Sequence, residues 1–390
     1  MAQLFDFGLV GLGVMGRNFL LNVADHHFCA IGLDTDSQKV ANLKDEGHSD
    51  GIEGTLDKVA FINKLVRPRK IMLLVPAGRP VDQVIDDLLP LLDSGDLIID
   101  GGNSHFEDTN RRFTSLKSKG IYFMGVGVSG GSEGARKGPS IMPGGDPEAY
   151  EIIKPIFEAV AAKVNNEPCV GFMGKGSAGN YVKMIHNGIE YALMQLIGES
   201  YHIMKWGLQL NNPSFKQTYH DWNQGDLQSF LVEITSQIFD KKDDLTSADL
   251  VDQILGKAKQ KGTGKWTSQN AMDLGVAIPT IDAAVSMRQI SGMIDIRMKA
   301  SEKYTEGSDA FAPEVSVEEV RDSLYFAFIM SYAQGMEQLS KASKEYQYGL
   351  NLESIAKIWR GGCIIRARFL EDIRLAYKND SSLESLLLSP

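Results

Sequence analysis

Short apolar runs alternate with amphipathic stretches along the first 176 residues of the chain. The runs are bounded by glycine, proline or asparagine, which is typical of strands buried on both faces. Strands are predicted at residues 4–10, 28–33, 71–75, 97–100, 121–124 and 170–173. Helices are predicted at residues 17–24, 81–92 and 146–161, and the glycine-rich residues 138–145 are predicted to form a loop. Strands that alternate with helices predict a parallel sheet with helices on both faces.

The pattern changes after residue 176, where strand signals thin out and long amphipathic helices dominate. These helices are predicted at residues 180–206, 227–239, 247–259, 281–299, 317–343 and 352–377. The first of them has one wholly polar face, made of Lys183, His186, Asn187 and Glu190, with Tyr191 at its edge. An amine, an imidazole, an amide and a carboxylate on one face suit acid–base chemistry. The alternative is a solvated helix face with a lysine–glutamate pair.

A glycine fingerprint lies between the first predicted strand and its helix, at Gly11, Gly13 and Gly16. In this context the glycines allow a tight turn, close approach to a pyrophosphate and packing of helix on strand. Asp34 ends the second predicted strand, 18 residues after Gly16, where an acid that binds the adenine ribose is expected. The alternative is a glycine-rich turn without a ligand. We therefore predict an α/β Rossmann-like, doubly wound domain at residues 1–176, followed by an all-helical substrate and dimerisation domain at residues 177–390.

Three further segments are candidates for substrate contacts. Asn103 and the run Ser129-Gly130-Gly131 follow predicted strand ends and are expected to reach one crevice, although these residue types also form ordinary turns. Residues 261–265, KGTGK, combine exposed backbone N–H groups with two lysines, which suits a phosphate or carboxylate; the alternative is a basic linker. Arg288 is either a bidentate anion contact or a surface charge.

Composition narrows the possible partners. The net charge of −10 argues against nucleic acid and against an anionic membrane. The three cysteines are far apart in the chain and indicate neither a disulfide framework nor a zinc site. No secretion signal and no apolar run of membrane-spanning length occurs, so a cytoplasmic location is predicted.

Six motifs of the chain, taken together, are very specific for one protein family. They are GLGVMGRN, IIDGGNS, GVSGGSEGARKGPSIMPGG, YVKMIHNGIEY, KGTGKWT and WRGGCIIRA. With these motifs the chain resembles the decarboxylating 6-phosphogluconate dehydrogenases of the β-hydroxyacid dehydrogenase superfamily, over nearly its whole length. The resemblance implies oxidative decarboxylation of 6-phosphogluconate to ribulose 5-phosphate and CO₂, with reduction of NAD or NADP and without a metal. It also implies a homodimer acting in the pentose phosphate pathway.

The resemblance also implies roles for individual residues. Lys183 is expected to take the C3 hydroxyl proton as a base and then to act as an acid at the keto oxygen, while Glu190 protonates C1. The implied substrate-binding residues are Asn103, Ser129, Gly130, Gly131, His186, Asn187, Tyr191, Lys261 and Arg288. The implied cofactor-binding residues are Gly11, Leu12, Gly13, Val14, Met15, Gly16, Asp34, Thr35, Asp36, Val75, Pro76, Ala77 and Asn103.

Two departures from the family pattern carry expectations of their own. Family members continue for several dozen residues beyond Pro390, and that tail supplies an arginine and a histidine to the substrate phosphate; weaker substrate binding is therefore expected for the chain as given. Where the family places Asn-Arg-Thr, this chain has Asp34-Thr35-Asp36, and Pro76 replaces a frequent lysine. These changes predict a preference for NAD over NADP, unless Lys39 rescues NADP binding. Two other functions stay open: a dehydrogenase for an unphosphorylated hydroxy acid, and a non-catalytic dinucleotide-binding protein.

Overall fold

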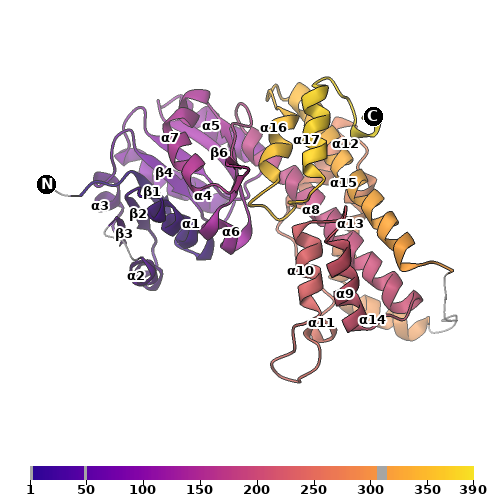
Figure 1. The fold of residues 1–390 in the computed structure, drawn as a ribbon. Helices are drawn as coiled ribbons and strands as arrows, with labels where there is room; N and C mark the ends of the chain where they lie inside the picture. The colour runs from indigo at the N-terminus through magenta and orange to yellow at the C-terminus, as the bar shows by residue number, and fades with distance from the viewer. Residues whose placement is uncertain (1–2, 48–50, 305–313) are drawn as a thin grey trace. The chain divides into compact units, whose positions relative to one another are not determined.

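The computed structural model describes residues 3–47, 51–304 and 314–390, drawn in Figure 1. Close contacts group the chain into two compact units. Unit 1 comprises Met1–Met184 and Ala342–Ile364, and unit 2 comprises Ile185–Lys341 and Ile365–Pro390. The predicted domain boundary at residue 176 stays a prediction, because compactness does not by itself define a separately folding domain.

Unit 1 is built on a seven-stranded sheet with the order β3-β2-β1-β4-β5-β6-β7. Neighbouring strands from β3 to β6 run parallel, and β7 is antiparallel to β6. The strands are β1 (Phe7–Val10), β2 (Ala30–Leu33), β3 (Ile52–Thr55), β4 (Lys70–Leu73), β5 (Leu97–Asp100), β6 (Tyr122–Ser129) and β7 (Ser140–Gly145). A separate two-stranded sheet pairs β8 (Lys163–Val164) with β9 (Glu167–Pro168).

Helices cover both faces of this sheet (Figure 1), as the alternation predicted. They are α1 (Val14–Asp25), α2 (Ser37–Glu46), α3 (Lys58–Asn63), α4 (Arg79–Leu88), the 3₁₀ turn η1 (Leu89–Leu91), α5 (Phe106–Lys117), α6 (Gly131–Lys137) and α7 (Pro147–Val160). A further helix of unit 1, α16 (Leu352–Trp359), contacts β7. Side chains of a single strand alternate between two apolar cores. Ile99 belongs to the same core as Phe19 of α1 on one face, and Ile98 belongs to the same core as Ile85 of α4 on the other. A sheet buried on both faces explains why its strands are continuous apolar runs.

Two predictions in unit 1 are wrong. Residues 138–145 are not a loop, because Ser140–Gly145 form β7, which pairs with β6 from Ser129 to Met124. Glycine in β7 serves close packing rather than a turn: a β-carbon on Gly144 would lie 2.2 Å from the backbone nitrogen of Gly179. Residues 170–173 form no named strand and contribute only an isolated bridge from Val170 to Ile141.

Unit 2 is helical among its described residues, and two long helices, α8 and α15, each contribute residues to both units. The helices are α8 (Ala178–His202), the π-helical turn η2 (Ile203–Gly207), α9 (Asn212–Trp222), α10 (Phe230–Ile238), α11 (Leu250–Gln253), α12 (Thr263–Leu274), α13 (Pro279–Ser291), α14 (Ile294–Lys303), α15 (Val317–Glu345), α17 (Leu370–Asn379) and the 3₁₀ turn η3 (Leu386–Leu388).

Three predicted helices are shorter or divided. Residues 247–259 contain only the single turn α11, and residues 281–299 divide between α13 and α14 at Gly292. Residues 352–377 divide between α16 and α17, because Gly362 adopts a φ of 66° that a regular helix does not allow. Helices α9 and α12 were missed, since both begin in glycine-, asparagine- or proline-containing segments.

No helix within the described ranges combines the length and the apolar character needed to cross a membrane.

Candidate active site

The glycine loop after β1 has the geometry that its sequence predicted. Gly11 has a φ of 101°, and a β-carbon there would lie 2.5 Å from the Leu74 carbonyl oxygen. A β-carbon on Gly16 would lie 1.9 Å from the Gly11 carbonyl oxygen, so only glycine lets α1 start this close to the loop. At Gly13 the space is open, because no heavy atom lies within 4 Å of a β-carbon added there. Among the described residues, no side chain caps the start of α1 and no acid lies in its first turn. A helix start of this kind suits the pyrophosphate of a dinucleotide.

The segments that follow β1, β4 and β5 lie side by side at the carboxyl edge of the sheet. Leu74 donates from its backbone nitrogen to the Val10 carbonyl (2.9 Å), and Gly101 donates likewise to the Leu73 carbonyl (2.9 Å). The strand order reverses between β1 and β4, and ligands of such sheets bind at that point. The predicted cofactor residues Val75, Pro76 and Ala77 therefore lie beside the glycine loop, and the last two are exposed.

Asp34 lies at the end of β2 with its side chain directed at the glycine loop. The side chain is 8% exposed, and its Oδ2 accepts a hydrogen bond of 2.7 Å from the backbone nitrogen of Leu12. Its Oδ1 accepts one of 3.0 Å from the backbone nitrogen of Asp36, and the Lys39 ammonium lies 3.5 Å from the carboxylate. Asp36 also caps α2, because its side chain accepts from the backbone nitrogen of Gln38 at 2.9 Å. Thr35 is exposed.

Two glycines of β6 let the first turns of α8, which carry Lys183, lie close to this strand. A β-carbon on Gly127 of β6 would lie 2.4 Å from the Lys183 β-carbon, and one on Gly125 would lie 2.1 Å from the side-chain oxygen of Asn180. From the helix side, a β-carbon on Gly179 would lie 2.2 Å from the Gly125 carbonyl oxygen. The first turns of α8 therefore rest directly on the backbone of β6. Lys183 is 6% exposed, so it is not part of a solvated helix face.

The polar residues farther along α8 belong to unit 2 and are also largely buried. His186 is fully buried, Asn187 is 8% exposed, and the side chain of Glu190 is 23% exposed. The His186 ring nitrogen Nδ1 lies 3.2 Å from the Asn187 side-chain oxygen and 3.9 Å from the Glu190 carboxylate. His186 thus lies close to two of the other predicted groups, and largely buried polar groups of this kind can hold a polyhydroxy substrate.

Tyr191, Arg288 and the start of α12 come together within unit 2. The Arg288 guanidinium carbon lies 3.8 Å from the centre of the Tyr191 ring. The Tyr191 ring also packs on Gly264, where a β-carbon would lie 2.5 Å from a ring carbon. Gly262 precedes α12 with a φ of 104°, and within the described part of the chain no side chain caps this helix. A cation and uncapped N–H groups beside one ring are a suitable site for an anion, and Lys261 is exposed next to them.

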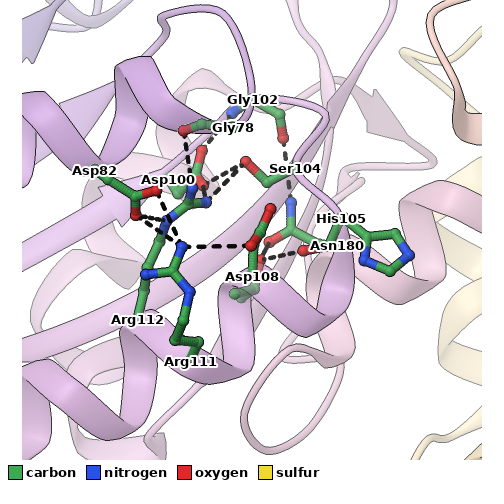
Figure 2. A network of polar contacts seen from close by, with 11 residues as sticks. Gly78, Asp82, Asp100, Gly102, Ser104, His105, Asp108, Arg111, Arg112 and Asn180 are labelled. Carbon is green, nitrogen blue, oxygen red and sulfur yellow. Dashed lines mark hydrogen bonds and ion pairs between the residues drawn. The ribbon is translucent and has the colours of Figure 1, made fainter.

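The residues around Asn103 form a network that the sequence analysis missed (Figure 2). Asn103 is exposed, but the neighbouring Asp100, Ser104 and Arg112 are buried and bonded to one another. Asn180 of α8 donates to the Gly102 carbonyl at 3.1 Å and accepts from the Thr109 hydroxyl at 3.0 Å. The sequence held one signal for this network, which is Asp100 at the end of an apolar run. Arg112 gave no signal, because the helix that carries it, α5, was not predicted.

Ser129, Gly130 and Gly131 lie at the end of β6, as expected, but the strand is longer than predicted. Gly125 is its last residue paired with β5, and β6 continues for four residues to Ser129 alongside β7. At roughly 3.3 Å per residue, Ser129 lies about 13 Å beyond Gly125 along the strand. Gly130 adopts a φ of 116° and packs against the Gly362 carbonyl, where a β-carbon would lie 2.6 Å away. A shared role with Asn103 stays a prediction.

Within the described ranges, no group of three or more histidine, cysteine, aspartate or glutamate side chains is arranged to hold a metal ion. Sheet order, glycine loop and Asp34 define the class of the molecule: a dinucleotide-binding protein with a Rossmann-like sheet, joined to a helical region that carries buried polar residues.

Comparison with known proteins specifies the family. The model for the NAD binding domain of 6-phosphogluconate dehydrogenase matches residues 6–183, and the model for the C-terminal domain of 6-phosphogluconate dehydrogenase matches residues 179–390. The chain is 48% identical to the decarboxylating 6-phosphogluconate dehydrogenase of Lactococcus lactis over 387 residues, which are 98% of this chain and 82% of that protein. It is also 48% identical, over 392 residues, to the Bacillus subtilis enzyme described as NADP(+)-dependent, with 98% of this chain and 82% of that protein covered. The chain belongs to the 6-phosphogluconate dehydrogenase family.

Solved structures agree with this assignment. The 6-phosphogluconate dehydrogenase of Plasmodium falciparum superposes with a TM-score of 0.94 at 43% identity, covering 98% of this chain and 84% of that one. A 3-hydroxyisobutyrate dehydrogenase from Salmonella typhimurium matches with a TM-score of 0.55 at 19% identity, over 82% of this chain and 99% of that one, which shows a shared fold alone.

Proposed function

We propose that this chain catalyses the NAD(P)-dependent oxidative decarboxylation of 6-phosphogluconate. The observation that carries the proposal is the 48% identity, over 98% of the chain, to relatives named for this reaction. Oxidation of the C3 hydroxyl gives a β-keto acid, whose keto group accepts the electron pair released with CO₂. Protonation of the resulting enediol at C1 then gives ribulose 5-phosphate. When bound, the nicotinamide dinucleotide supplies the hydride acceptor.

The side chains on α8 suit the proton transfers that this reaction needs. Lys183, taken as a neutral amine, removes the C3 hydroxyl proton, and its ammonium then polarises the keto oxygen while CO₂ leaves. Glu190 lies two helical turns farther along α8 and donates the proton to C1. His186 and Asn187, which lie between them in the sequence and contact each other at 3.2 Å, orient the sugar hydroxyls.

The anion site of unit 2 suits the phosphate end of the substrate. Arg288, stacked on Tyr191, presents a planar set of N–H donors that matches phosphate oxygens. The uncapped start of α12 adds backbone donors, and Lys261 adds charge. For the substrate carboxylate we propose Asn103 and the run Ser129 to Gly131 of unit 1, on the family resemblance of their motifs.

The direct test is an assay of the purified chain with 6-phosphogluconate and either cofactor. Absorbance of the reduced nicotinamide and released CO₂ are recorded together, and one CO₂ per reduced cofactor is expected. Gluconate is the matched control, because it lacks only the phosphate. Equal turnover of gluconate would favour a dehydrogenase for an unphosphorylated acid, and cofactor binding without any turnover would favour a non-catalytic role.

We further propose that NAD is preferred to NADP. Both oxygens of Asp34 already accept one backbone hydrogen bond, and a carboxylate has about four lone-pair positions, so acceptors remain for the 2′- and 3′-hydroxyls of the ribose. A 2′-phosphate at the same place would meet a buried negative charge. One unit-charge repulsion at about 4 Å amounts to roughly 4 kcal/mol at an effective dielectric constant of 20. Because Lys39 and solvent offset part of it, we expect a net preference of about 1–3 kcal/mol, or roughly 10- to 100-fold.

The ratio of kcat/KM for NAD to that for NADP tests this preference. Asp34→Asn keeps the shape of the side chain and an acceptor for Leu12 but removes the charge, so the ratio should fall by about tenfold or more. Lys39→Met is the companion variant: a loss of NADP turnover alone would show that Lys39 holds the 2′-phosphate. Equal values for the two cofactors in the unmodified chain would contradict the preference.

We also propose that the chain forms a homodimer through unit 2. The proposal is supported by large apolar side chains exposed on and beside α14, including Ile296 (66%), Met298 (59%) and Leu255 (66%). Patches of this kind on a folded protein commonly mark association sites. Light scattering on a size-exclusion column should give twice the chain mass for the unmodified protein and a smaller mass for Met298→Glu. The mass of a single chain for the unmodified protein would contradict the proposal.

A further inference from the structure

We propose that Arg112 is a positioning residue that couples the cofactor loop to the substrate loop. The cofactor loop is residues 75–78, after β4, and the substrate loop is residues 101–104, after β5, which carries Asn103. The inference rests on the proposed function for the identity of the substrate, but its cofactor half does not depend on it.

Arg112 contacts both loops at once through its guanidinium group, as Figure 2 shows. Its Nη2 donates to the Gly78 carbonyl at 3.0 Å, at the end of the cofactor loop. Its Nη1 donates to the Asp100 carboxylate at 3.2 Å and to the Ser104 hydroxyl at 3.3 Å, which lie at the two ends of the substrate loop. The third nitrogen, Nε, donates to Asp82 of α4 at 2.8 Å.

The substrate loop is held from both of its ends by this arrangement. The Ser104 hydroxyl donates to Asp100 at 2.6 Å, and the backbone nitrogen of Gly102 donates to the same carboxylate at 3.1 Å. Asn180, three residues before Lys183 on α8, donates to the Gly102 carbonyl at 3.1 Å. The backbone that presents Asn103 is therefore fixed by Arg112 on one side and by the helix of Lys183 on the other.

Burial makes the network sensitive to small changes. The side chains of Arg112 and Asp100 are 2% and 1% exposed. Burial raises the pKa of Asp100, and the Ser104 hydroxyl and the Arg112 charge act in the opposite direction. The hydrogen bond from Arg112 is the main cause of the lowered pKa of Asp82. Arg112 thus compensates the carboxylates of Asp82 and Asp100, which belong to different segments. Removing the charge of Arg112 would leave the buried Asp100 carboxylate without a compensating positive charge.

The shape of the guanidinium group is as important as its charge. Arginine presents five N–H donors in a fixed plane, whereas lysine presents a compact ammonium on a flexible stem. A lysine at position 112 preserves a positive charge for Asp100 or Asp82, but it cannot reach Gly78, Asp82 and Asp100 together. The two loops would then be free to shift relative to each other.

The adjacent Arg111 provides a matched control. It also pairs with Asp82, at 3.0 Å, and with Asp108, at 3.3 Å. Its side chain is 56% exposed, however, and both of these aspartates lie on helices, outside the two loops. Arg111→Lys makes the same chemical change one residue away and removes a surface contact only.

The experiment compares Arg112→Lys, Arg111→Lys and the unmodified chain. Fluorescence titration gives the dissociation constants of NAD and NADP, initial rates give kcat and the substrate KM, and thermal unfolding reports on folding. For Arg112→Lys we expect both the cofactor dissociation constant and the substrate KM to rise by about tenfold, the scale of one lost charge-assisted hydrogen bond. For Arg111→Lys we expect the cofactor dissociation constants, kcat and the substrate KM to stay unchanged. A merely structural role would lower kcat in proportion to the folded fraction and leave the dissociation constant and KM of the folded molecules as they were.

Unchanged cofactor binding and unchanged KM in folded Arg112→Lys would overturn the proposal, and so would equal effects of the two lysine variants. If the unmodified chain does not turn over 6-phosphogluconate, the proposed function fails, whereas the cofactor titrations still decide whether Arg112 orders residues 75–78. If Arg112→Lys does not fold, Ser104→Ala takes its place. This variant removes only the substrate-loop end of the network, so KM should rise while cofactor binding stays the same; an unchanged KM would overturn the proposal that this network positions the substrate loop.

Discussion

Gly127→Ala is expected to displace Lys183, the proposed base, without touching any ligand. The added β-carbon would lie 2.4 Å from the Lys183 β-carbon, 3.0 Å from its Cγ and 3.2 Å from the Gly179 carbonyl oxygen. Ordinary van der Waals contacts lie at 3.4–4 Å, so α8 and β6 must separate by about 1 Å. Neither side yields easily, because the contacts involve a main-chain oxygen and the first carbon of a side chain.

A shift of this size is large for acid–base chemistry. A misplacement of about 1 Å lowers the rate by roughly 10²-fold, and overpacking of a core contact costs about 1–3 kcal/mol of unfolding free energy. We therefore expect kcat with 6-phosphogluconate to fall by about 10²-fold in Gly127→Ala. Cofactor binding should be nearly unchanged, since the glycine loop and Asp34 lie on other strands.

The assay measures kcat and KM at saturating cofactor, together with the temperature of unfolding. Gly198→Ala is the control, because Gly198 lies on the same helix and nothing lies within 4 Å of an added β-carbon. That control should keep its activity and gain stability, since alanine favours a helix interior over glycine by about 1 kcal/mol. A folded Gly127→Ala protein with normal kcat would refute the argument that the glycine contact positions Lys183.

The remaining predictions concern the proposed proton transfers, the phosphate site and the response to acid. Lys183→Met should lower turnover by about 10²- to 10⁴-fold and leave cofactor titrations unaltered, and near-normal turnover would remove its assignment as base. Glu190→Gln should lower kcat rather than raise KM, whereas a raised KM at constant kcat would make Glu190 a binding residue. Arg288→Lys should raise the substrate KM by about tenfold, with no effect on cofactor affinity; an unchanged KM would place the phosphate elsewhere. Hydrogen bonds from arginines lower the pKa of Asp82 in the folded chain, so acidification through about pH 4 protonates the unfolded chain first and reduces stability. Asp82→Asn should weaken that pH dependence in urea unfolding series, and an unaltered dependence would contradict the pKa assignment.

The sequence by itself determined the features that depend on neighbouring residues. The apolar runs and the glycine fingerprint predicted the strand–turn–helix start of unit 1, since the turn, the helix start and Asp34 follow from local backbone geometry and a short spacing. The helical period likewise grouped Lys183, His186, Asn187 and Glu190, because residues three, four and seven apart share a face of any regular helix.

Only the tertiary structure decided the features whose partners are distant in the chain. Residues 140–145 became a strand because β6 offers paired backbone groups, although their glycines and proline favour a turn in isolation. Arg288 acquired its place on the Tyr191 ring, 97 positions away in the sequence, through helix packing. Arg112 compensates Asp100 and reaches Gly78 only because the packing of α5 against the sheet brings these groups together. Local patterns carry no information about such partners, because the free energy of burying and pairing these groups depends on contacts that exist only after the chain has folded.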